Sequence, residues 1–459
     1  MKKIAVIGAG ITGLSAAYYL SKLGDVEVDV YEKSDRAGGK INTYRKDGYA
    51  IELGPESYLA RKESMTDLAK EIGLGDDLVR NATGISYIYV NNKLSSLPKG
   101  SVLGMPTEFV PFMTTDLLST GAKLRAGVDF LKKPTPVYTD ISVGRFFRGR
   151  LGDEVLENII EPLLSGIYST KIDELSLLST FPHFKELEEQ HGSLIKGVYH
   201  QKNQKSRDAK TPTGKKQGQF LQFKHGLQSF IDRLKETTEQ QGASMHFGYD
   251  VSAIKKHGKR YRLTANERTK EYDNIIVTTP HFQYKRWFND LPLEYFKHME
   301  ATSVATVVMA FDEDQVKNDI DGTGFVVSRK MDTTITACTW TSKKWTHSAP
   351  EGKALLRAYV GRPGDPIAKE KDDDEIIRLA RKDLDDIMTI NGEPELSIVT
   401  RLKNSMPQYK VGHKEMIAGI KDYMAQQYPG IILTGASHNG VGLPDCVDQA
   451  IEAVESITE

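Results

Sequence analysis

Six consecutive residues near the start of the chain have the types and spacing that bind a dinucleotide. They follow the pattern G-x-G-x-x-G and are Gly8, Ala9, Gly10, Ile11, Thr12 and Gly13. The first glycine permits a tight turn, the second lets the backbone approach a pyrophosphate, and the third allows a helix to pack closely on a strand. A helix that starts here also presents N–H groups and a partial positive charge to phosphates. Glu32, 19 residues after Gly13, could accept hydrogen bonds from ribose hydroxyls.

A second pair of glycines follows this acidic residue, in the segment Arg36-Ala37-Gly38-Gly39. Two glycines here indicate a second close approach of the backbone to a ligand, and Arg36 could pair with Glu32 or with a phosphate. An NAD site does not usually need this second loop, whereas an FAD site of the glutathione-reductase type does. We therefore predict FAD and include the flanking Lys33 and Lys40 in its site. The alternative is a plain glycine turn with a surface arginine.

A third glycine-rich loop lies near the C-terminus, between an apolar strand at 431–434 and a helix that begins near Pro444. The N-terminus of that helix is another positive dipole end. Beside the pyrimidine edge of a flavin, it would stabilise the negative charge that develops at N1–C2=O on reduction. We expect cofactor contacts from Gly435, Val441, Gly442 and Leu443. Both ends of the chain would then build one site.

Secondary structure predicted from the pattern of apolar residues can position these loops. Residues 3–7 and 26–31 are typical of buried strands and 11–23 of a helix, which together make a parallel βαβ unit. A segment at 273–279 is a further buried strand, and 107–200 is mostly helical. Other expected elements are helices at 64–73, 226–241 and 373–390, a hairpin at 85–97 with Asn91-Asn92 at its turn, and a second sheet from strands at 303–311, 324–328, 334–340 and 354–360.

Length and composition limit the possible functions. The chain has 459 residues, 61 Lys+Arg against 62 Asp+Glu, and 39% hydrophobic residues, as in a soluble globular protein of two or three domains. The balanced charge argues against a nucleic-acid partner, and no apolar run is long enough to span a membrane. The two cysteines, Cys338 and Cys446, cannot build a disulfide scaffold or a zinc site based on cysteine, which fits the cytoplasm. The apolar start is interrupted by glycines, so we do not expect a signal peptide.

Several segments of this chain resemble the oxygen-dependent porphyrinogen oxidases, flavoproteins of haem biosynthesis that oxidise coproporphyrinogen III or protoporphyrinogen IX. The resemblance covers nearly the whole chain and looks closest to the soluble coproporphyrinogen oxidases of Gram-positive bacteria. Beyond the first glycine pattern it rests on Ile51-Glu52-Leu53-Gly54-Pro55-Glu56-Ser57, Glu161-Pro162-Leu163-Leu164-Ser165-Gly166-Ile167-Tyr168, Pro407-Gln408-Tyr409 with Gly412-His413, and Gly440-Val441-Gly442-Leu443-Pro444-Asp445-Cys446. The N-terminal glycine pattern and the last of these segments, 440–446, also occur in amine oxidases.

The resemblance implies an α/β fold with a Rossmann-like FAD domain of discontinuous segments, a substrate domain with a mixed sheet, and a helical domain. With the elements above it gives boundaries for each part. We expect the FAD domain at 1–80, 223–285 and 401–459, the substrate domain at 81–106 and 286–400, the helical domain at 107–200, and a flexible basic loop at 201–222. The loop could alternatively be a basic lid over an anionic ligand.

The resemblance also implies individual contacts. Gly54, Pro55, Glu56 and Ser57 would lie against the flavin, and Val251 would meet the adenine side through its backbone. The chain departs from related bacterial sequences at Leu402, where a tryptophan often follows the equivalent of Arg401. This puts one aromatic contact with the flavin in doubt.

The reaction that the resemblance implies is a six-electron oxidation of the porphyrinogen. FAD would take two electrons per cycle and O2 would reoxidise it to give H2O2, with a hydride passing from a bridge carbon to the flavin. Aromatisation supplies driving force, so we nominate no catalytic acid or base. The rival hypotheses are a protoporphyrinogen IX oxidase, a flavin amine oxidase, and a non-catalytic carrier of tetrapyrroles or flavin.

Carboxylates on the substrate call for basic side chains. We expect Arg61 and Lys62 to meet the substrate propionates, and Tyr168 to be a candidate wall of the pocket. His413 is more typical of a packing histidine than of an acid or base, and His438 could touch the cofactor. The acidic run 372–375 is expected to start a helix and not to bind a metal. A ferrochelatase-like partner could receive the product.

Overall fold

The computed structural model describes residues 1–98, 101, 105, 108–136, 139–208, 218–292, 299–317 and 320–458. The chain forms two compact units, each built from segments far apart in the sequence. Unit 1 contains Met1–Asn81, Gln219–Glu300 and Lys414–Glu459, and unit 2 contains Ala82–Gly218 and Ala301–His413.

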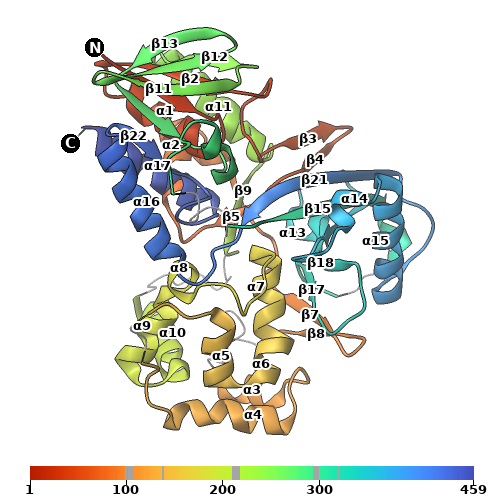
Figure 1. Ribbon diagram of the computed structural model, residues 1–459. Coiled ribbons are helices and arrows are strands. Elements are labelled where there is room, and N and C mark those ends of the chain that lie inside the picture. The colour runs from red at the N-terminus through yellow and green to blue at the C-terminus, as the bar shows by residue number, and fades with distance from the viewer. Residues whose placement is uncertain are drawn as a thin grey trace. The chain divides into compact units, whose positions relative to one another are not determined.

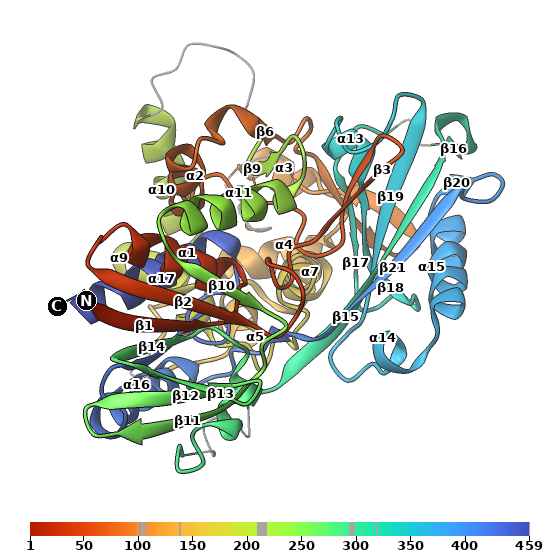
Figure 2. The same ribbon diagram turned by 90° about the horizontal axis from the view of Figure 1, so that it is seen from above.

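Unit 1 is organised around a five-stranded sheet in which all neighbouring strands run parallel (Figures 1 and 2). The strands predicted at 3–7, 26–31, 273–279 and 431–434 all belong to it, so the later segments do return to the first strand. The spatial order is β10 (Ser244–Phe247), β2 (Val26–Glu32), β1 (Lys2–Ile7), β14 (Asn274–Val277) and β22 (Ile431–Leu433). The buried part of each inner strand is mostly apolar, as is typical of a parallel sheet covered on both faces, although β2 also contains the buried Asp29.

Helices pack against this sheet and share one apolar core with it. The helix predicted at 11–23 connects β1 to β2 and packs against helices from the middle and the end of the chain. The helices predicted at 64–73, at 226–241 and near Pro444 are also present. They are α1 (Ile11–Ser21), α2 (Ser64–Glu71), α11 (Leu227–Gln240) and α17 (Leu443–Thr458), and α16 (His413–Gln427) precedes β22.

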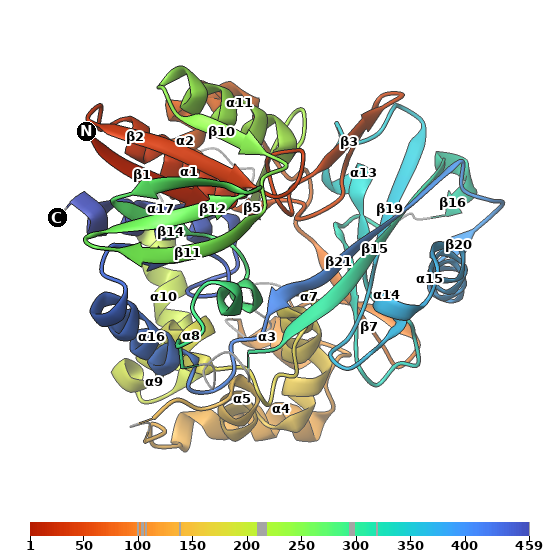
Figure 3. The same ribbon diagram turned by 45° about the horizontal axis from the view of Figure 1, so that its top comes forward.

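Short strands complete unit 1, and one of them begins at the predicted site residue Val251. An antiparallel sheet of three strands lies beside β1 and β14 (Figure 3). These smaller elements are β11 (Val251–His257), β12 (Arg260–Ala265) and β13 (Arg268–Tyr272); β3 (Thr43–Lys46) with β4 (Tyr49–Glu52); β5 (Tyr58–Leu59), β9 (Phe220–Phe223) and β6 (Leu78–Arg80); and the short helices η1 (Gly75–Asp77) and η4 (His281–Arg286).

Unit 2 contains the second sheet, which is mixed because β17 and β7 pair in parallel while its other neighbours are antiparallel. The hairpin predicted at 85–97 forms its edge. Asn91 and Asn92 have φ values of 52° and 57°, as a two-residue turn between twisted strands requires. The order is β21 (Leu396–Pro407), β15 (Ala301–Asp312), β19 (Lys353–Val360), β18 (Ile335–Trp340), β17 (Gly324–Val327), β7 (Ser86–Val90) and β8 (Lys93–Ser96).

Helices and a two-stranded sheet, β16 (Val316–Lys317) with β20 (Thr389–Ile390), complete unit 2. The amphipathic helix predicted at 373–390 is α15 (Asp373–Ile387), which packs on β15 and β21. The segment predicted to be mostly helical contains α3 (Phe109–Thr114), α4 (Thr120–Gly127), η2 (Val128–Leu131), α5 (Val143–Leu151), α6 (Asp153–Val155), η3 (Leu156–Ile160), α7 (Glu161–Tyr168), α8 (Leu177–Thr180), α9 (Pro182–His191) and α10 (Leu194–Asp208).

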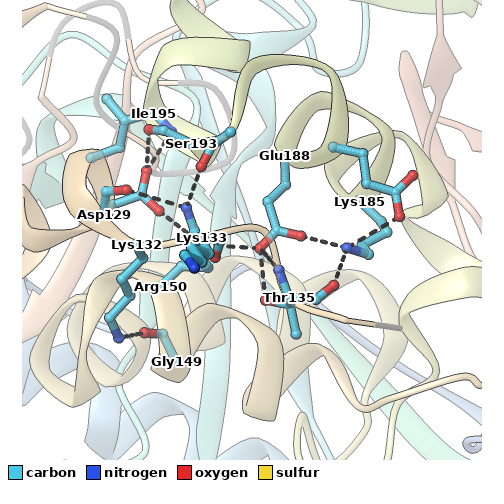
Figure 4. Close-up of polar contacts among 12 residues, drawn as sticks. Asp129, Lys132, Lys133, Thr135, Gly149, Arg150, Lys185, Glu188, Ser193 and Ile195 are labelled. Atoms are coloured by element: carbon cyan, nitrogen blue, oxygen red, sulfur yellow. Dashed lines mark hydrogen bonds and ion pairs between the residues drawn. The ribbon is translucent and has the colours of Figure 1, made fainter. Parts of the chain in front are cut away.

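A buried network of charged groups connects these helices (Figure 4). The Arg150 guanidinium pairs with Asp129 and, at 3.2 Å, with Glu188. Glu188 also accepts the ammonium of Lys185 at 2.6 Å and the N–H of Thr135 at 2.9 Å. Because the arginine and both acids that it binds are at most 2% exposed, the network fixes the loop after η2 against α5, α9 and α10.

The prediction of a flexible loop at 201–222 is wrong at both ends of this range. The helix α10 continues to Asp208, and β9 begins at Phe220. A polar composition does not prevent a helix, because Lys and Gln have good helix propensity and an exposed helix needs few apolar residues. The middle of the expected loop, 209–217, lies outside the described residues.

Besides the two ends of that loop, which fall inside α10 and β9, two further expected domain boundaries fall inside regular elements. The boundary at 400/401 would cut β21, and the one at 285/286 would cut η4. A strand that pairs along its whole length belongs with its sheet, so Arg401 and Leu402 lie in unit 2, opposite Ala305 and Val304 of β15. The other boundaries remain predictions.

Candidate functional site

The first glycine turn joins β1 to α1 in unit 1. Gly8 has a φ of 103°, and its N–H donates to the Tyr31 carbonyl at 2.8 Å. A Cβ on Gly13 would lie 1.8 Å from the Gly8 carbonyl oxygen, whereas a Cβ on Gly10 would have no atom within 4 Å. The close packing predicted for Gly13 is therefore present. Gly10 instead faces open space, where a ligand could approach the backbone.

The start of α1 suits an anion. Gly10 is the residue that precedes the helix, and no side chain caps it. The N–H groups of a first helical turn have no partner inside the helix, and the dipole adds a partial positive charge there. Ile11 and Thr12 occupy this turn. A phosphate group beside them would satisfy both requirements.

The carboxylate of Glu32 is held at the end of β2 by hydrogen bonds from two loops. One oxygen accepts from the Ala9 N–H at 2.8 Å, and the other from the Ser34 N–H at 2.8 Å and the Ser34 hydroxyl at 2.7 Å. A carboxylate has about four acceptor positions. Glu32 therefore organises the glycine turn and retains capacity for a hydroxyl.

The second glycine loop lies directly against the first. The Gly38 N–H donates to the Ala9 carbonyl at 2.8 Å, and a Cβ on Gly39 would lie 3.3 Å from the Gly10 Cα. The Arg36 guanidinium donates to three carbonyls of its own loop, those of Ala37, Gly39 and Ile41. Within the described residues Arg36 thus stabilises the loop. The ion pair with Glu32 that we considered is not formed.

Lys33 and Lys40 have different surroundings although both flank this loop. The ammonium of Lys33 lies 3.4 Å from Asp250, on a side chain that is 72% exposed. Desolvation lowers the pKa of Lys40, although water reaches its side chain. Its backbone carbonyl lies where a Cβ on Gly54 would be, at 1.8 Å. The structure therefore brings Lys40 and Gly54 together and directs Lys33 to the surface.

The remaining residues of the predicted flavin segment continue from Gly54 to β5. Glu56 is buried, and its carbonyl accepts from the Gln222 side chain of β9 at 2.8 Å. Pro55 and Ser57 flank it and are only partly exposed. Val251 is also buried at the start of β11, where its carbonyl accepts from the Trp287 indole N–H at 3.0 Å. A carbonyl has two acceptor lone pairs, so this bond still leaves the Val251 backbone able to meet an adenine.

The C-terminal loop between β22 and α17 reaches the first turn of α1. Gly435 has a φ of 102°, and a Cβ on it would lie 3.4 Å from the Thr12 hydroxyl oxygen. Gln449 of α17 binds the far side of the loop, donating to the Gly440 carbonyl at 3.3 Å and accepting from the Asn439 N–H at 3.1 Å. Both ends of the chain thus meet in unit 1, next to the glycine turn.

Sequence reasoning missed a buried polar cluster behind this loop. The Tyr284 hydroxyl and His438 Nε2 are 2.8 Å apart, and the His281 ring lies 3.2 Å from the Ser437 hydroxyl. Burial lowers the pKa of His281, which favours the neutral ring. His438 is 3% exposed and supports the loop through Tyr284. His281 and Tyr284 follow Pro280 in the short helix η4, and no sequence pattern marks them.

The basic residues expected to bind substrate are placed differently from one another. Lys62 forms an ion pair with Asp445 of α17 and is only partly exposed, whereas Arg61 is exposed. Tyr168 ends α7 in unit 2, and its side chain lies outside the described residues. His413 stacks on Tyr409 with ring centroids 4.1 Å apart, which is the packing role that we expected.

Both cysteines are buried. Burial raises the pKa of the Cys446 thiol to about 11, although a hydrogen bond with Thr12 acts in the opposite direction. Among the described residues no group of three or more His, Cys, Asp or Glu side chains could hold a metal ion. No helix in the described part of the chain is long and apolar enough to cross a membrane.

Residues 11–458 match the family of flavin-containing amine oxidoreductases. Over 99% of both sequences the chain is 54% identical to the coproporphyrinogen III oxidase of Staphylococcus aureus (strain NCTC 8325 / PS 47). It is 47% identical to that of Bacillus subtilis (strain 168), over 99% of this chain and 97% of the relative. A chloroplastic protoporphyrinogen oxidase of Nicotiana tabacum is 28% identical, over 99% of this chain and 85% of the relative.

Solved structures show the same fold. A crystal structure from Exiguobacterium sp. 255-15, provisionally assigned as a protoporphyrinogen oxidase, has a TM-score of 0.89 and 40% identity over 99% of this chain and 98% of that one. Reduced UDP-galactopyranose mutase has a TM-score of 0.73 at 15% identity, over 100% of this chain and 94% of that one. The second similarity concerns the fold alone.

Proposed function

Because this chain belongs to the flavin-containing amine oxidoreductase family, we propose that it is an FAD-dependent coproporphyrinogen III oxidase. The observation that carries the proposal is the 54% identity, over 99% of both sequences, to an enzyme of that name. The reaction would remove six electrons from coproporphyrinogen III to give coproporphyrin III, with three molecules of O2 reduced to three of H2O2.

The residues of unit 1 fit FAD on observations that do not depend on relatives. Space is open at Gly10, the start of α1 has no side-chain cap, and the Glu32 carboxylate is fixed at the end of β2. These features would hold the pyrophosphate and the adenosine ribose. An NAD site would not usually need the second glycine loop at Gly38 and Gly39, which lies against the first glycine turn.

The cofactor, when bound, supplies the two-electron redox chemistry. The protein would hold FAD between segments from the N-terminal and C-terminal parts of the chain. The Val251 backbone would meet the adenine. Lys40 and Gly54–Ser57 would lie along the flavin, and Gly435 with Val441–Leu443 would approach the flavin ring. The positive end of α17 would favour the negative charge of the reduced ring. No side chain is needed as a strong base, because aromatisation drives loss of the protons.

The carboxylates of the substrate would still require positive groups. Arg61 is exposed and can meet them, and Tyr168 remains a proposed wall of the substrate site. We further propose that the enzyme works in the cytoplasm and passes its product to a ferrochelatase-like enzyme.

Oxygen consumption tests the proposed function directly. Purified holoenzyme should consume O2 when coproporphyrinogen III is the sole reductant, and coproporphyrin fluorescence should rise in parallel. Protoporphyrinogen IX is the second candidate substrate because the Exiguobacterium structure carries that assignment at 40% identity. Turnover of both substrates under identical conditions ranks them, and a strong preference for protoporphyrinogen IX would reverse our assignment.

An anaerobic experiment separates an enzyme from a carrier. Coproporphyrinogen III mixed with the holoenzyme without O2 should bleach the flavin absorbance in a single cycle. A flavin that stays oxidised would mean that the protein binds but does not react.

A further inference from the structure

Lys62 and Asp445 form an ion pair between segments that are 383 positions apart in the sequence. Lys62 lies in the short turn between β5 and α2, and Asp445 lies in the first turn of α17. The side chains are 35% and 22% exposed, so neither is freely solvated. An expected substrate-binding lysine is therefore occupied by a carboxylate of the protein itself.

The same carboxylate shapes the glycine loop that precedes α17. Its second oxygen accepts from the Gly442 N–H at 3.2 Å. A Cβ on Gly440 would lie 2.7 Å from the Asp445 Cβ, and Gly440 has a φ of 100°. Asp445 is thus in contact with the part of the loop that we expect beside the flavin, residues 440–443. Its own position decides where this backbone lies.

A second bond joins the same two segments. The Ser64 hydroxyl donates to the Pro444 carbonyl at 3.1 Å, one residue before Asp445. Behind these polar contacts α2 packs on α17, with Leu68 and Ala69 in the shared core. The two helices therefore fix the distance between Lys62 and Asp445, and the ion pair needs little rearrangement to form.

The charges at this position also favour a pair over a lone lysine. Asp445 is stabilised at the positive end of α17, and Lys62 neutralises the negative charge that would otherwise stand beside the proposed flavin. Removal of Lys62 would leave a partly buried acid next to a ring that becomes negative on reduction. Loss of either partner should therefore disturb both the loop and the local charge.

We propose that Lys62 is a positioning residue, which acts through Asp445 to hold the turn Gly440–Leu443 in the conformation that binds the flavin. This inference rests on the proposed FAD site, and it replaces the expectation that Lys62 meets substrate propionates. It assigns the two residues a joint effect on cofactor affinity and potential.

A double-mutant cycle on FAD affinity tests the proposal. The variants are Lys62→Met, Asp445→Asn and the double variant, and FAD is titrated into each apoprotein by fluorescence quenching. Each single change should raise the Kd for FAD about tenfold, and the double variant should be little weaker than either single one, because contacting residues couple. Lys62→Arg should restore an affinity close to that of the unchanged protein.

A matched cycle on the same helix gives the control. Lys70 and Asp67 of α2 form an ion pair at 3.0 Å that is 60% and 57% exposed. Lys70→Met, Asp67→Asn and their combination should leave the Kd for FAD unchanged. The flavin midpoint potential should become more negative in Lys62→Met and stay the same in Lys70→Met, which a general loss of stability would not produce.

The substrate role makes the opposite prediction. If Lys62 binds propionates, Lys62→Met raises the KM for coproporphyrinogen III while the Kd for FAD stays unchanged and Asp445→Asn has no matching effect. That result overturns the proposal, as does additivity in the cycle. The protein could bind FAD, and the variants could show the coupling, while the unchanged protein fails to oxidise coproporphyrinogen III. That result would overturn the proposed function and leave the positioning role of Lys62 supported. A protein that binds no FAD would overturn both.

Discussion

The glycines of the first turn show how single residues separate folding from ligand binding. Gly13 is required by the protein itself, because a methyl group there would overlap the Gly8 carbonyl. Gly10 is not, since its surroundings leave room for a Cβ. Within the same sequence pattern, the fold therefore requires a glycine at position 13, whereas only a bound ligand would require one at position 10.

Gly10→Ala should therefore reduce FAD binding without unfolding the protein. Its φ of −72° is allowed for alanine, so we expect the free energy of unfolding to change by less than about 1 kcal/mol. The added methyl group would meet the pyrophosphate, and the Kd for FAD should rise at least about tenfold. Gly13→Ala is the contrast: a clash with the backbone should cost about 3 kcal/mol of stability. An alanine at Gly10 with normal FAD affinity would contradict the site.

Glu32→Ala should weaken FAD binding by about 10- to 100-fold, because charge-assisted hydrogen bonds contribute about 1.5–3 kcal/mol each. FAD titration of the apoprotein measures the change. Glu27→Ala on the same strand is a suitable control, since its carboxylate faces Lys3 and Lys270 at 3.0 and 2.8 Å. An unchanged affinity in Glu32→Ala would exclude a ribose contact.

Cys446 should not react with flavin or with thiol reagents in the folded protein. Burial raises the pKa of its thiol to about 11, so the nucleophilic thiolate is scarce at neutral pH. Acid precipitation should release all yellow colour into the supernatant, and Ellman's reagent should label the protein only after unfolding. Flavin that stays with the precipitate would indicate a covalent bond.

At the scale of elements, β2 carries an acidic residue whose titration affects stability. Desolvation tends to raise the pKa of Asp29, but hydrogen bonds from His246, Lys270 and Tyr272 outweigh it, and the pKa is lowered. The folded protein then binds fewer protons than the unfolded chain in acid. The stabilisation from Asp29 is complete above the pKa of an aspartate in the unfolded chain, about 3.9. It is lost as the pH falls through the lower pKa of Asp29 in the folded protein.

Asp29→Asn should therefore destabilise the protein at neutral pH and flatten the acid limb of its stability curve. Urea unfolding followed between about pH 3 and pH 6 tests this, within the range where carboxylates titrate. Asp25→Asn, just before β2, serves as the control. Among the described residues, none donates a hydrogen bond to the Asp25 carboxylate. A variant with the same pH dependence as the unchanged protein would show that Asp29 is not responsible.

Element prediction succeeded where periodicity and turn chemistry agreed and failed where composition was the only guide. The predicted strands of the parallel sheet have buried apolar residues in a strand pattern, and Asn91-Asn92 marks the hairpin of the mixed sheet in unit 2 by a turn that few other residue pairs tolerate. By contrast, the polar end of α10 was assigned to a loop although its residues favour a helix. Contacts between distant segments, such as Lys62 with Asp445 or Tyr284 with His438, leave no local pattern at all.

At the scale of the whole molecule, each unit depends on segments that the chain supplies at different times. Unit 2 joins residues 82–218 to 301–413, and its helical part is fixed by the buried network around Arg150. A buried charge without its partner is far more costly than a lost surface pair. The network should therefore dominate the stability of this part.

Arg150→Met should lower the free energy of unfolding by about 3–5 kcal/mol, because it leaves the buried Asp129 without its cation and removes one of the two cations that bind Glu188. Arg148→Met is the matched control two positions away, since Arg148 is 39% exposed and pairs with exposed acids. It should cost about 1 kcal/mol or less. Thermal and urea unfolding compare the two, and equal losses would remove the network from its proposed role.

The hydrogen bond from the Lys2 ammonium to the Ile457 carbonyl, at 2.8 Å, joins the first residue of β1 to the last turn of α17. A ribosome reaches α17 only after it has made every other element of unit 1. The first glycine turn of the nascent chain therefore stays exposed until α17 has been synthesised and packs against it. FAD binding should consequently require α17, and chains truncated before Leu443 should be purified without the yellow colour of flavin.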